Sequence, residues 1–178
     1  TSSAAFLQHA FEPKTGRFHN HLGFDRRWID KQGSEDCQGR ALWALGMGVG
    51  RSPYRSFQMM AGQLFALALP ALTGFSSPRA WAFGLLGIHE YLRRLSGDSL
   101  VNQTRETLTS RLMELFEETA QPDWQWFEKE LTYDNAKLPH ALILSGQATG
   151  DHAVLKCGLQ ALRWLAEVQT SEKGHFRP

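Results

Sequence analysis

The chain has 178 residues, of which 42% are hydrophobic and 21% charged, and its formal net charge is +1. This length and composition predict one soluble domain with a real hydrophobic core and exclude a disordered or fibrous chain. The near-zero charge and the scattered basic residues argue against a nucleic-acid partner or an anionic membrane partner. The longest apolar stretch, around 65–75, is broken by Pro70 and Gly74. It falls short of the ~20 residues that a membrane span needs.

Cysteine usage and the first residues bear on location. Cys37 and Cys157 are the only cysteines, and each falls within a predicted helix. Such a pair is more typical of buried free thiols in a reducing compartment than of a disulfide. Residues 1–3 also lack the basic region and apolar core of a signal peptide. We therefore predict a cytoplasmic location.

The hydrophobic pattern predicts an all-α chain without a sheet. The predicted helices span residues 34–46, 53–72, 77–95, 99–118, 134–145 and 151–168. Ser34, Ser77 and Asp134 are predicted N-caps, and Gly46 and Gly146 are predicted to end helices. The residues before Ser34 and the stretch 119–133 are predicted to be long connections, where binding sites commonly lie.

A weak internal repeat organises the predicted helices. Residues 41–46, 82–87 and 141–146 are small and apolar nearly all round, which is typical of buried helices, whereas the intervening helices carry charge on one face. The pattern predicts three hairpins, each with an inner and an outer helix. If these hairpins stack around one axis, polar residues at the starts of the inner helices converge at one end. Those residues are Glu35, Asp36, Arg79, Trp81, Asp134 and Asn135.

This alternation of helices, with acids and aromatic residues entering the inner ones, resembles the α/α toroids of six-hairpin glycosidases and N-acylglucosamine 2-epimerase-like proteins. The segments 33–43 (GSEDCQGRALW), 132–139 (TYDNAKLP) and 174–178 (GHFRP) are similar to an uncharacterised bacterial family associated with glycosyltransferases. The resemblance implies a single toroid domain over 1–178. About six of the roughly twelve helices of an (α/α)6 barrel are present, so we expect half a toroid whose later hairpins lie beyond this sequence or come from a partner.

The same resemblance implies function and partners. It implies a sugar or oligosaccharide ligand, a glycosyltransferase as a candidate partner, and self-association through exposed inner helices. Neither nucleic acid nor a membrane is expected as a partner.

Three carboxylates are the catalytic candidates, because hydrolysis of a glycosidic bond commonly uses two carboxyl groups. Asp36 and Asp134, in predicted first turns, suit an ionised base or stabiliser, since the helix dipole favours the anion. Glu130, within an aromatic-rich stretch, suits a general acid if apolar surroundings raise its pKa. Ordinary capping explains both aspartates equally well, and Glu128 and Glu130 could simply be solvated.

Substrate-binding candidates surround these acids. They are Asp25, Arg27, Trp28, Glu35, Arg40, Trp126, Tyr133, Asn135 and His140. Aromatic rings offer apolar area with polar edges on which a sugar stacks, and the planar fork of arginine holds a carboxylate or hydroxyl groups. The structural alternatives are core aromatics for the rings and structural ion pairing within the cluster of Asp25, Arg26 and Arg27.

Histidine offers a competing mechanism. Epimerisation proceeds by proton transfer, for which His140 is suited near neutral pH. The alternative is a satisfied core histidine. His19 and His21 could suggest a metal, but no third ligand is evident, so we predict neither a metal nor a cofactor. A Walker A loop, a dinucleotide fingerprint and a Gly-x-Ser-x-Gly elbow are also missing.

Three functions are therefore considered. The leading hypothesis is a glycoside hydrolase-like domain that uses carboxylate acid/base chemistry. The second is a sugar epimerase or isomerase that depends on His140. The third is a non-catalytic helical module that binds glycan or associates with a glycosyltransferase. Fold analogy supports all three and does not choose among them.

Overall fold

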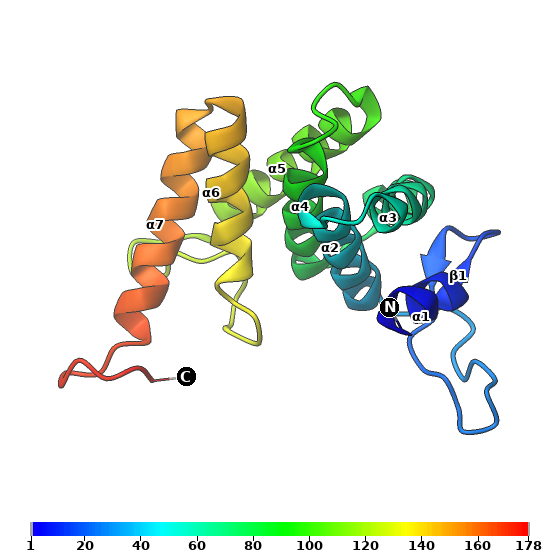
Figure 1. Ribbon diagram of the computed structural model, residues 1–178. Coiled ribbons are helices and arrows are strands. Elements are labelled where there is room, and N and C mark those ends of the chain that lie inside the picture. The colour runs from blue at the N-terminus through cyan, green and yellow to red at the C-terminus, as the bar shows by residue number, and fades with distance from the viewer. Residues whose placement is uncertain (1, 178) are drawn as a thin grey trace. The chain divides into compact units, whose positions relative to one another are not determined.

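The computed structural model describes residues 2–177 and shows a mostly helical chain, which confirms the predicted all-α class (Figure 1). Thr1 and the last residue of the 174–178 segment, Pro178, lie outside the described residues. The helices of the described part are α1 (Ser2–Ala10), α2 (Glu35–Arg51), α3 (Arg55–Ala68), α4 (Pro78–Leu92), α5 (Ser99–Thr119), α6 (Lys137–Thr149) and α7 (His152–Val168). A short 3₁₀ helix, η1 (Leu69–Gly74), follows α3, and strands β1 (Phe11–Glu12) and β2 (Arg17–Phe18) form an antiparallel pair.

The chain divides into two compact units. Unit 1 ends at Glu106 and unit 2 begins at Thr107, so the boundary falls within α5. The predicted convergence of the inner-helix starts involves residues of both units and stays a prediction, as does the toroid.

Several predicted boundaries are wrong for identifiable reasons. The first predicted helix continues through Gly46 to Arg51. The stretch predicted as one helix over 53–72 is divided, because Pro70 has no backbone N–H and the chain changes to 3₁₀ geometry after Ala68. The predicted N-terminal connection instead contains α1 and the β1–β2 hairpin. Gly16 closes that hairpin with a φ of 68°, a conformation that glycine adopts at no steric cost.

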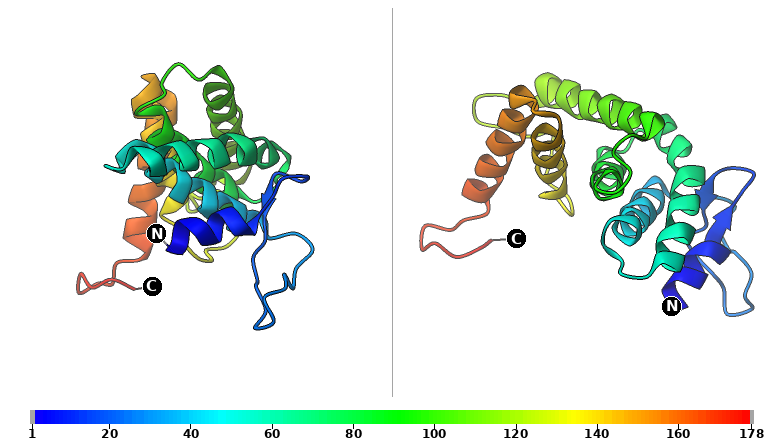
Figure 2. Two further views of the ribbon diagram at one scale, coloured as in Figure 1. Left: turned by 45° about the vertical axis from the view of Figure 1, so that its right-hand side comes forward. Right: turned by 45° about the horizontal axis from the view of Figure 1, so that its top comes forward.

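In unit 1, the backbones of α2 and α4 touch. A Cβ on Gly46 would overlap the carbonyl oxygen of Gly87, and a Cβ on Gly87 would lie 2.5 Å from the carbonyl oxygen of Leu42. Seven residues earlier on both helices, Gly39 meets Ala80. The paired positions advance together along both helices, so α2 and α4 run parallel, and the views of Figures 1 and 2 agree on this arrangement. Gly46 is therefore a packing residue and not the predicted helix end.

A buried glutamine joins three elements of unit 1. Gln38 of α2 is fully buried, and its amide nitrogen donates to the carbonyl oxygens of Gly16 and Ala68, each at 2.9 Å. Its side-chain oxygen accepts from the Phe18 N–H at 3.0 Å. One side chain therefore satisfies backbone groups of the N-terminal hairpin and of the end of α3.

In unit 2, α6 and α7 form an antiparallel hairpin. A Cβ on Gly146 would lie 2.6 Å from the Leu155 nitrogen, and a Cβ on Gly158 would lie 2.9 Å from Ile143. The paired positions advance in opposite directions along the two helices. Gly146 thus lies inside α6, where it was predicted to end the helix, and it permits close packing instead.

One stretch of unit 1, Arg55–Gly74, has the length and composition of a membrane span, with a mean hydropathy of 1.2. It comprises α3 and η1, so the continuous α-helix is only 14 residues long. Ala61, Phe65 and Ala68 are fully buried in the core of unit 1. We therefore interpret α3 as a core helix. In the most apolar 18-residue window of Arg55–Gly74, however, only 33% is buried, which leaves part of the apolar surface of this stretch exposed.

Both cysteines are free thiols. Cys157 is buried in unit 2, and burial raises the pKa of its thiol to about 12, with a smaller contribution from Glu117. Cys37 is half-buried, and burial also raises the pKa of its thiol. The prediction of free thiols is confirmed, and their burial is complete only for Cys157.

Replacement of Gln38 by leucine is expected to destabilise unit 1 by about 3 kcal/mol, because it leaves buried backbone groups without hydrogen-bond partners. Hydrogen exchange of the α2 amides in increasing urea measures the change. Gln8→Leu, at an exposed position of the same unit, is the control and should leave the exchange unchanged. Equal protection in both variants would show that the Gln38 contacts are not stabilising.

Two Gly→Ala substitutions are expected to change the free energy of unfolding in opposite directions. Gly46→Ala forces a methyl group into the backbone of α4 and should cost about 3 kcal/mol of unfolding free energy. Gly62→Ala in α3 meets its nearest atom, of Val49, at 3.7 Å and should gain up to about 1 kcal/mol from helix propensity. Urea unfolding followed by circular dichroism measures both. A neutral Gly46→Ala would contradict the close approach of α2 and α4.

Candidate functional site

Glu35 ties the starts of α2 and α4 together. Ser34 caps α2 by accepting from the Cys37 N–H, and Ser77 caps α4 in the same way through the Ala80 N–H. Glu35 Oε2 accepts from the backbone N–H groups of Ser76 at 3.0 Å and Ser77 at 2.7 Å. This carboxylate oxygen therefore holds the backbone that enters α4, which is the structural alternative to a binding role. The binding role of Glu35 stays a prediction.

Asp36 and Arg40 pair with each other. Their side chains are 2.8 Å apart across one turn of α2, and the Arg40 guanidinium lies over the Phe83 ring at 4.4 Å from its centroid. The ion pair is an ordinary arrangement across one helix turn. The cation–ring contact reaches the buried Phe83 of α4. The catalytic role of Asp36 and the binding role of Arg40 stay predictions, and this pairing is the structural alternative to both.

Residues 19–30 form a second, hairpin-like turn in unit 1. The half-buried ring of Trp28 stacks on His19 with centroids 4.9 Å apart and also contacts Phe6 at 5.9 Å. Asp25 and Arg27 are exposed at the tip of this turn, with their charged atoms 3.9 Å apart. The predicted structural alternative of an ion pair is thus present, although a pair this exposed contributes little to stability. Among the described residues, no cluster of three or more histidine, cysteine or acidic side chains could hold a metal.

Trp126 belongs to the core of unit 2. It is fully buried, and its ring packs against Phe127 and Trp164 with centroid distances of 5.3 and 5.8 Å. The prediction that it binds a ligand is wrong, because a wholly buried ring offers no stacking surface. Glu130 is exposed, so the apolar surroundings predicted for a general acid are not present around it.

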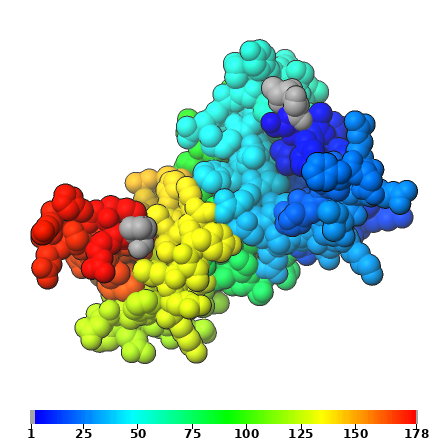
Figure 3. All heavy atoms as spheres, turned by 90° about the horizontal axis from the view of Figure 1, so that it is seen from below, coloured from blue at the N-terminus to red at the C-terminus, as the bar shows by residue number. Residues whose placement is uncertain are grey.

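A groove of about 700 Å³ lies in unit 2 between residues 131–137 and the segment that follows α7. Its lining residues are Leu131, Thr132, Tyr133, Asp134, Asn135, Ala136, Lys137, Val168, Gln169, Phe176 and Arg177. Figure 3 shows the two segments, yellow and red, next to each other on one face of the molecule. Of the predicted site residues, the groove unites Tyr133, Asp134 and Asn135.

Asp134 occupies a left-handed turn at the edge of the groove, with a φ of 50°. It was predicted to cap a helix starting there, but α6 begins at Lys137 and has Ala136 at its cap position. The Asp134 carbonyl oxygen accepts from the Lys137 N–H at 2.9 Å, and Asn135 Oδ1 accepts from the Thr132 N–H at 3.2 Å. These bonds close the turn. Left-handed backbone in a residue other than glycine is strained and is frequent at functional sites.

The opposite wall of the groove is a turn formed by residues 169–177. The Arg177 N–H donates to the Gln169 carbonyl at 2.7 Å, and the Ser171 N–H donates to the His175 carbonyl at 2.8 Å. Gly174 makes the reversal possible with a φ of 75°. The turn presents Phe176, whose side chain is 72% exposed, beside Arg177.

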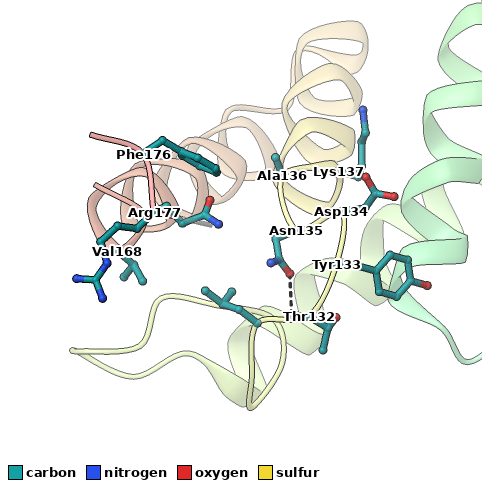
Figure 4. A pocket seen from close by; sticks show the side chains of 11 residues that line it. Thr132, Tyr133, Asp134, Asn135, Ala136, Lys137, Val168, Phe176 and Arg177 are labelled. Carbon is teal, nitrogen blue, oxygen red and sulfur yellow. Dashed lines mark hydrogen bonds between the residues drawn. The ribbon is translucent and has the colours of Figure 1, made fainter. Parts of the chain in front are cut away.

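The side chains of the groove separate into two groups (Figure 4). Phe176 and Arg177 lie on one side of the 132–137 segment, and the Asn135 amide lies between them and the Thr132 backbone. The Tyr133 ring and the Asp134 carboxylate point to the other side of that segment. His140, farther along α6, is exposed and is not among the lining residues.

Gln169 and Arg177 line the groove but were not among the predicted site residues. Arg177 lies in the 174–178 segment that carries part of the family resemblance, which was a usable signal. Nothing in the local pattern singled out Gln169, because it ends an ordinary amphipathic helix.

Comparisons of the chain with family models, with curated proteins and with solved structures found no match.

Two substitutions at Asp134 are expected to differ in stability. Asn tolerates left-handed backbone and Val does not, while both remove the carboxylate. Asp134→Val should therefore be about 1–2 kcal/mol less stable than Asp134→Asn. Urea unfolding followed by the fluorescence of the tryptophans measures the difference. Equal stability of the two variants would contradict the left-handed turn.

Proposed function

We propose that this protein is carbohydrate-active and that the groove between residues 131–137 and 168–177 binds a sugar or a short glycan. The groove carries the proposal because it combines an exposed aromatic ring, two carboxamides and a guanidinium within about 700 Å³. This volume lies in the range of about 300–1,000 Å³ that is typical of small-ligand sites.

Each group has a specific role in the proposal. The exposed ring of Phe176 offers a flat apolar surface for the C–H face of a sugar ring. The amides of Asn135 and Gln169 both donate and accept hydrogen bonds, as a ligand with many hydroxyl groups requires. The planar fork of Arg177 suits a pair of neighbouring hydroxyl groups or the carboxylate of an acidic sugar.

Binding is better supported than hydrolysis. Asp134 is the single carboxylate among the lining residues, and Glu130 lies outside them. A two-carboxylate hydrolysis would therefore need its second acid from elsewhere, with Asp134 as the base or stabiliser. Epimerisation by His140 has less support, because His140 does not line the groove. The non-catalytic glycan-binding module is accordingly the form of the proposal that the groove favours, with a glycoside hydrolase-like activity second.

A cytoplasmic location and a glycosyltransferase partner remain part of the proposal. The two free thiols fit a reducing compartment. The partner rests on the family resemblance alone.

A titration with mannose, glucose, N-acetylglucosamine and their short oligosaccharides tests the proposal. Saturation-transfer NMR should detect binding by the parent chain. Phe176→Ala and Arg177→Gln should each weaken the affinity roughly tenfold, since each removes one favourable contact with the sugar. Arg163→Gln, an exposed arginine of α7 outside this groove, is the matched control and should bind as the parent does.

Product analysis by mass spectrometry separates binding from turnover. Release of smaller sugars by the parent and not by Asp134→Asn would support the hydrolase. An isomer of unchanged mass, lost in His140→Gln, would favour the epimerase. Absence of binding to every sugar, or equal binding by the groove variants and the parent, would contradict a carbohydrate site in this groove.

A further inference from the structure

Unit 1 carries a different groove, on the exposed side of α3. Its volume is about 580 Å³, and α3 contributes lining residues on successive turns from Arg55 to Ala66. At 1.5 Å per residue these positions span roughly 16 Å of helix. The other wall is formed by Val49 near the end of α2, by Tyr91 near the end of α4 and by Leu95, which follows α4. The groove is therefore long relative to its volume and suits an extended ligand.

Exposed apolar side chains gather at this groove. Met59 is 60% exposed and Leu95 46% exposed, and both line the groove. On the same helix, Leu67 is also 60% exposed. Exposed apolar side chains that gather around a groove indicate a binding surface, whereas isolated ones need no explanation.

The charge at this groove is positive. Arg55 and Arg94 line it, and its lining residues include no aspartate or glutamate. In the same unit, the Glu90 carboxylate is bound by Arg51 at 2.6 and 2.7 Å and approached by Arg93 at 3.8 Å. This carboxylate is therefore committed to other arginines, and hydrogen bonding to Arg51 lowers its pKa, so that it stays ionised in that pairing. Among the described residues, no carboxylate pairs with Arg55 or Arg94.

We propose that the α3 groove binds a single-chain anionic amphiphile, such as a long-chain carboxylate. The aliphatic chain lies along Met59, Gly62 and Ala66, and the head group is held by the guanidinium groups of Arg55 and Arg94. Two arginines are suited to a carboxylate or phosphate because their planar forks bind such anions bidentately. The site lies in unit 1, and the proposal is independent of the sugar groove in unit 2.

The shape of the groove favours this ligand over larger partners. A concave site of about 580 Å³ matches one small molecule, whereas a membrane surface or a partner helix would contact a broader and flatter area. Gly62 lines the groove. A Cβ on Gly62 would meet its nearest atom, of Val49, at 3.7 Å. A larger side chain at this position would therefore occupy the space that the proposal assigns to the aliphatic chain.

The test uses dodecanoate below its micelle concentration and NMR of chain labelled in the methionine methyl groups. The Met59 signal should shift with saturation, and the Met113 signal, from unit 2, should stay in place. The double variant Arg55→Gln/Arg94→Gln should weaken dodecanoate binding at least about tenfold, because both charge-assisted contacts are lost. Gly62→Leu should abolish binding by filling the groove, and Arg163→Gln in unit 2 should leave the affinity unchanged.

Ligand controls make the proposal refutable. Dodecyltrimethylammonium has the same chain with a cationic head and should bind at least about tenfold more weakly. Equal binding of the two amphiphiles, an unchanged affinity in both groove variants, or a stationary Met59 signal would overturn the proposal. Co-sedimentation with phosphatidylglycerol vesicles in the absence of monomer binding would also overturn it and would assign the α3 surface to a membrane interface.

Discussion

Unit 1 depends on the contact between two helix backbones at Gly46 and Gly87. Because no side chain separates them there, α2 and α4 lie as close as backbone atoms allow, and any added methyl group meets a carbonyl oxygen. The same contact sets the register of the helices, since Gly39 meets Ala80 seven residues earlier on each. The parallel alignment that results brings both helix starts to one end of the unit.

That alignment explains how the acids at the start of α2 are used. Glu35 reaches the backbone N–H groups that precede α4 only because the two starts are level, and Asp36 pairs with Arg40 one turn along. Gln38, which lies between Asp36 and Arg40 in the sequence, satisfies backbone groups of the hairpin and of the end of α3 at once. The polar residues at the start of α2, which the sequence suggests as site residues, therefore make structural contacts. Glu35 binds the backbone before α4, Asp36 pairs with Arg40, and Gln38 binds the hairpin and the end of α3.

The two grooves are built by different physical means. The groove of unit 2 lies between two irregular segments, one turned by the left-handed Asp134 and the other by the positive φ of Gly174. It presents amides, a ring and a cation, which suit a polar ligand. The groove of unit 1 follows regular helix geometry along α3 and presents methyl groups and guanidinium groups, which suit an amphiphile. Loop chemistry and helix amphipathicity are thus the basis of the two different ligand classes that we propose for one chain.

The sequence by itself determined the helical class and the existence of the main helices, and it singled out the 131–137 stretch as a candidate site, because hydrophobic periodicity, caps and polar clusters are local properties. It did not reveal that Gly46 and Gly146 are packing residues, that Trp126 is core, or that Arg177 and Asn135 line the same groove. Those facts depend on which atoms lie opposite each residue, and residues far apart along the chain supply them. A glycine that ends a helix and one that admits a neighbouring backbone look alike in sequence, and only the tertiary structure distinguishes them, through the carbonyl oxygen that a Cβ would strike.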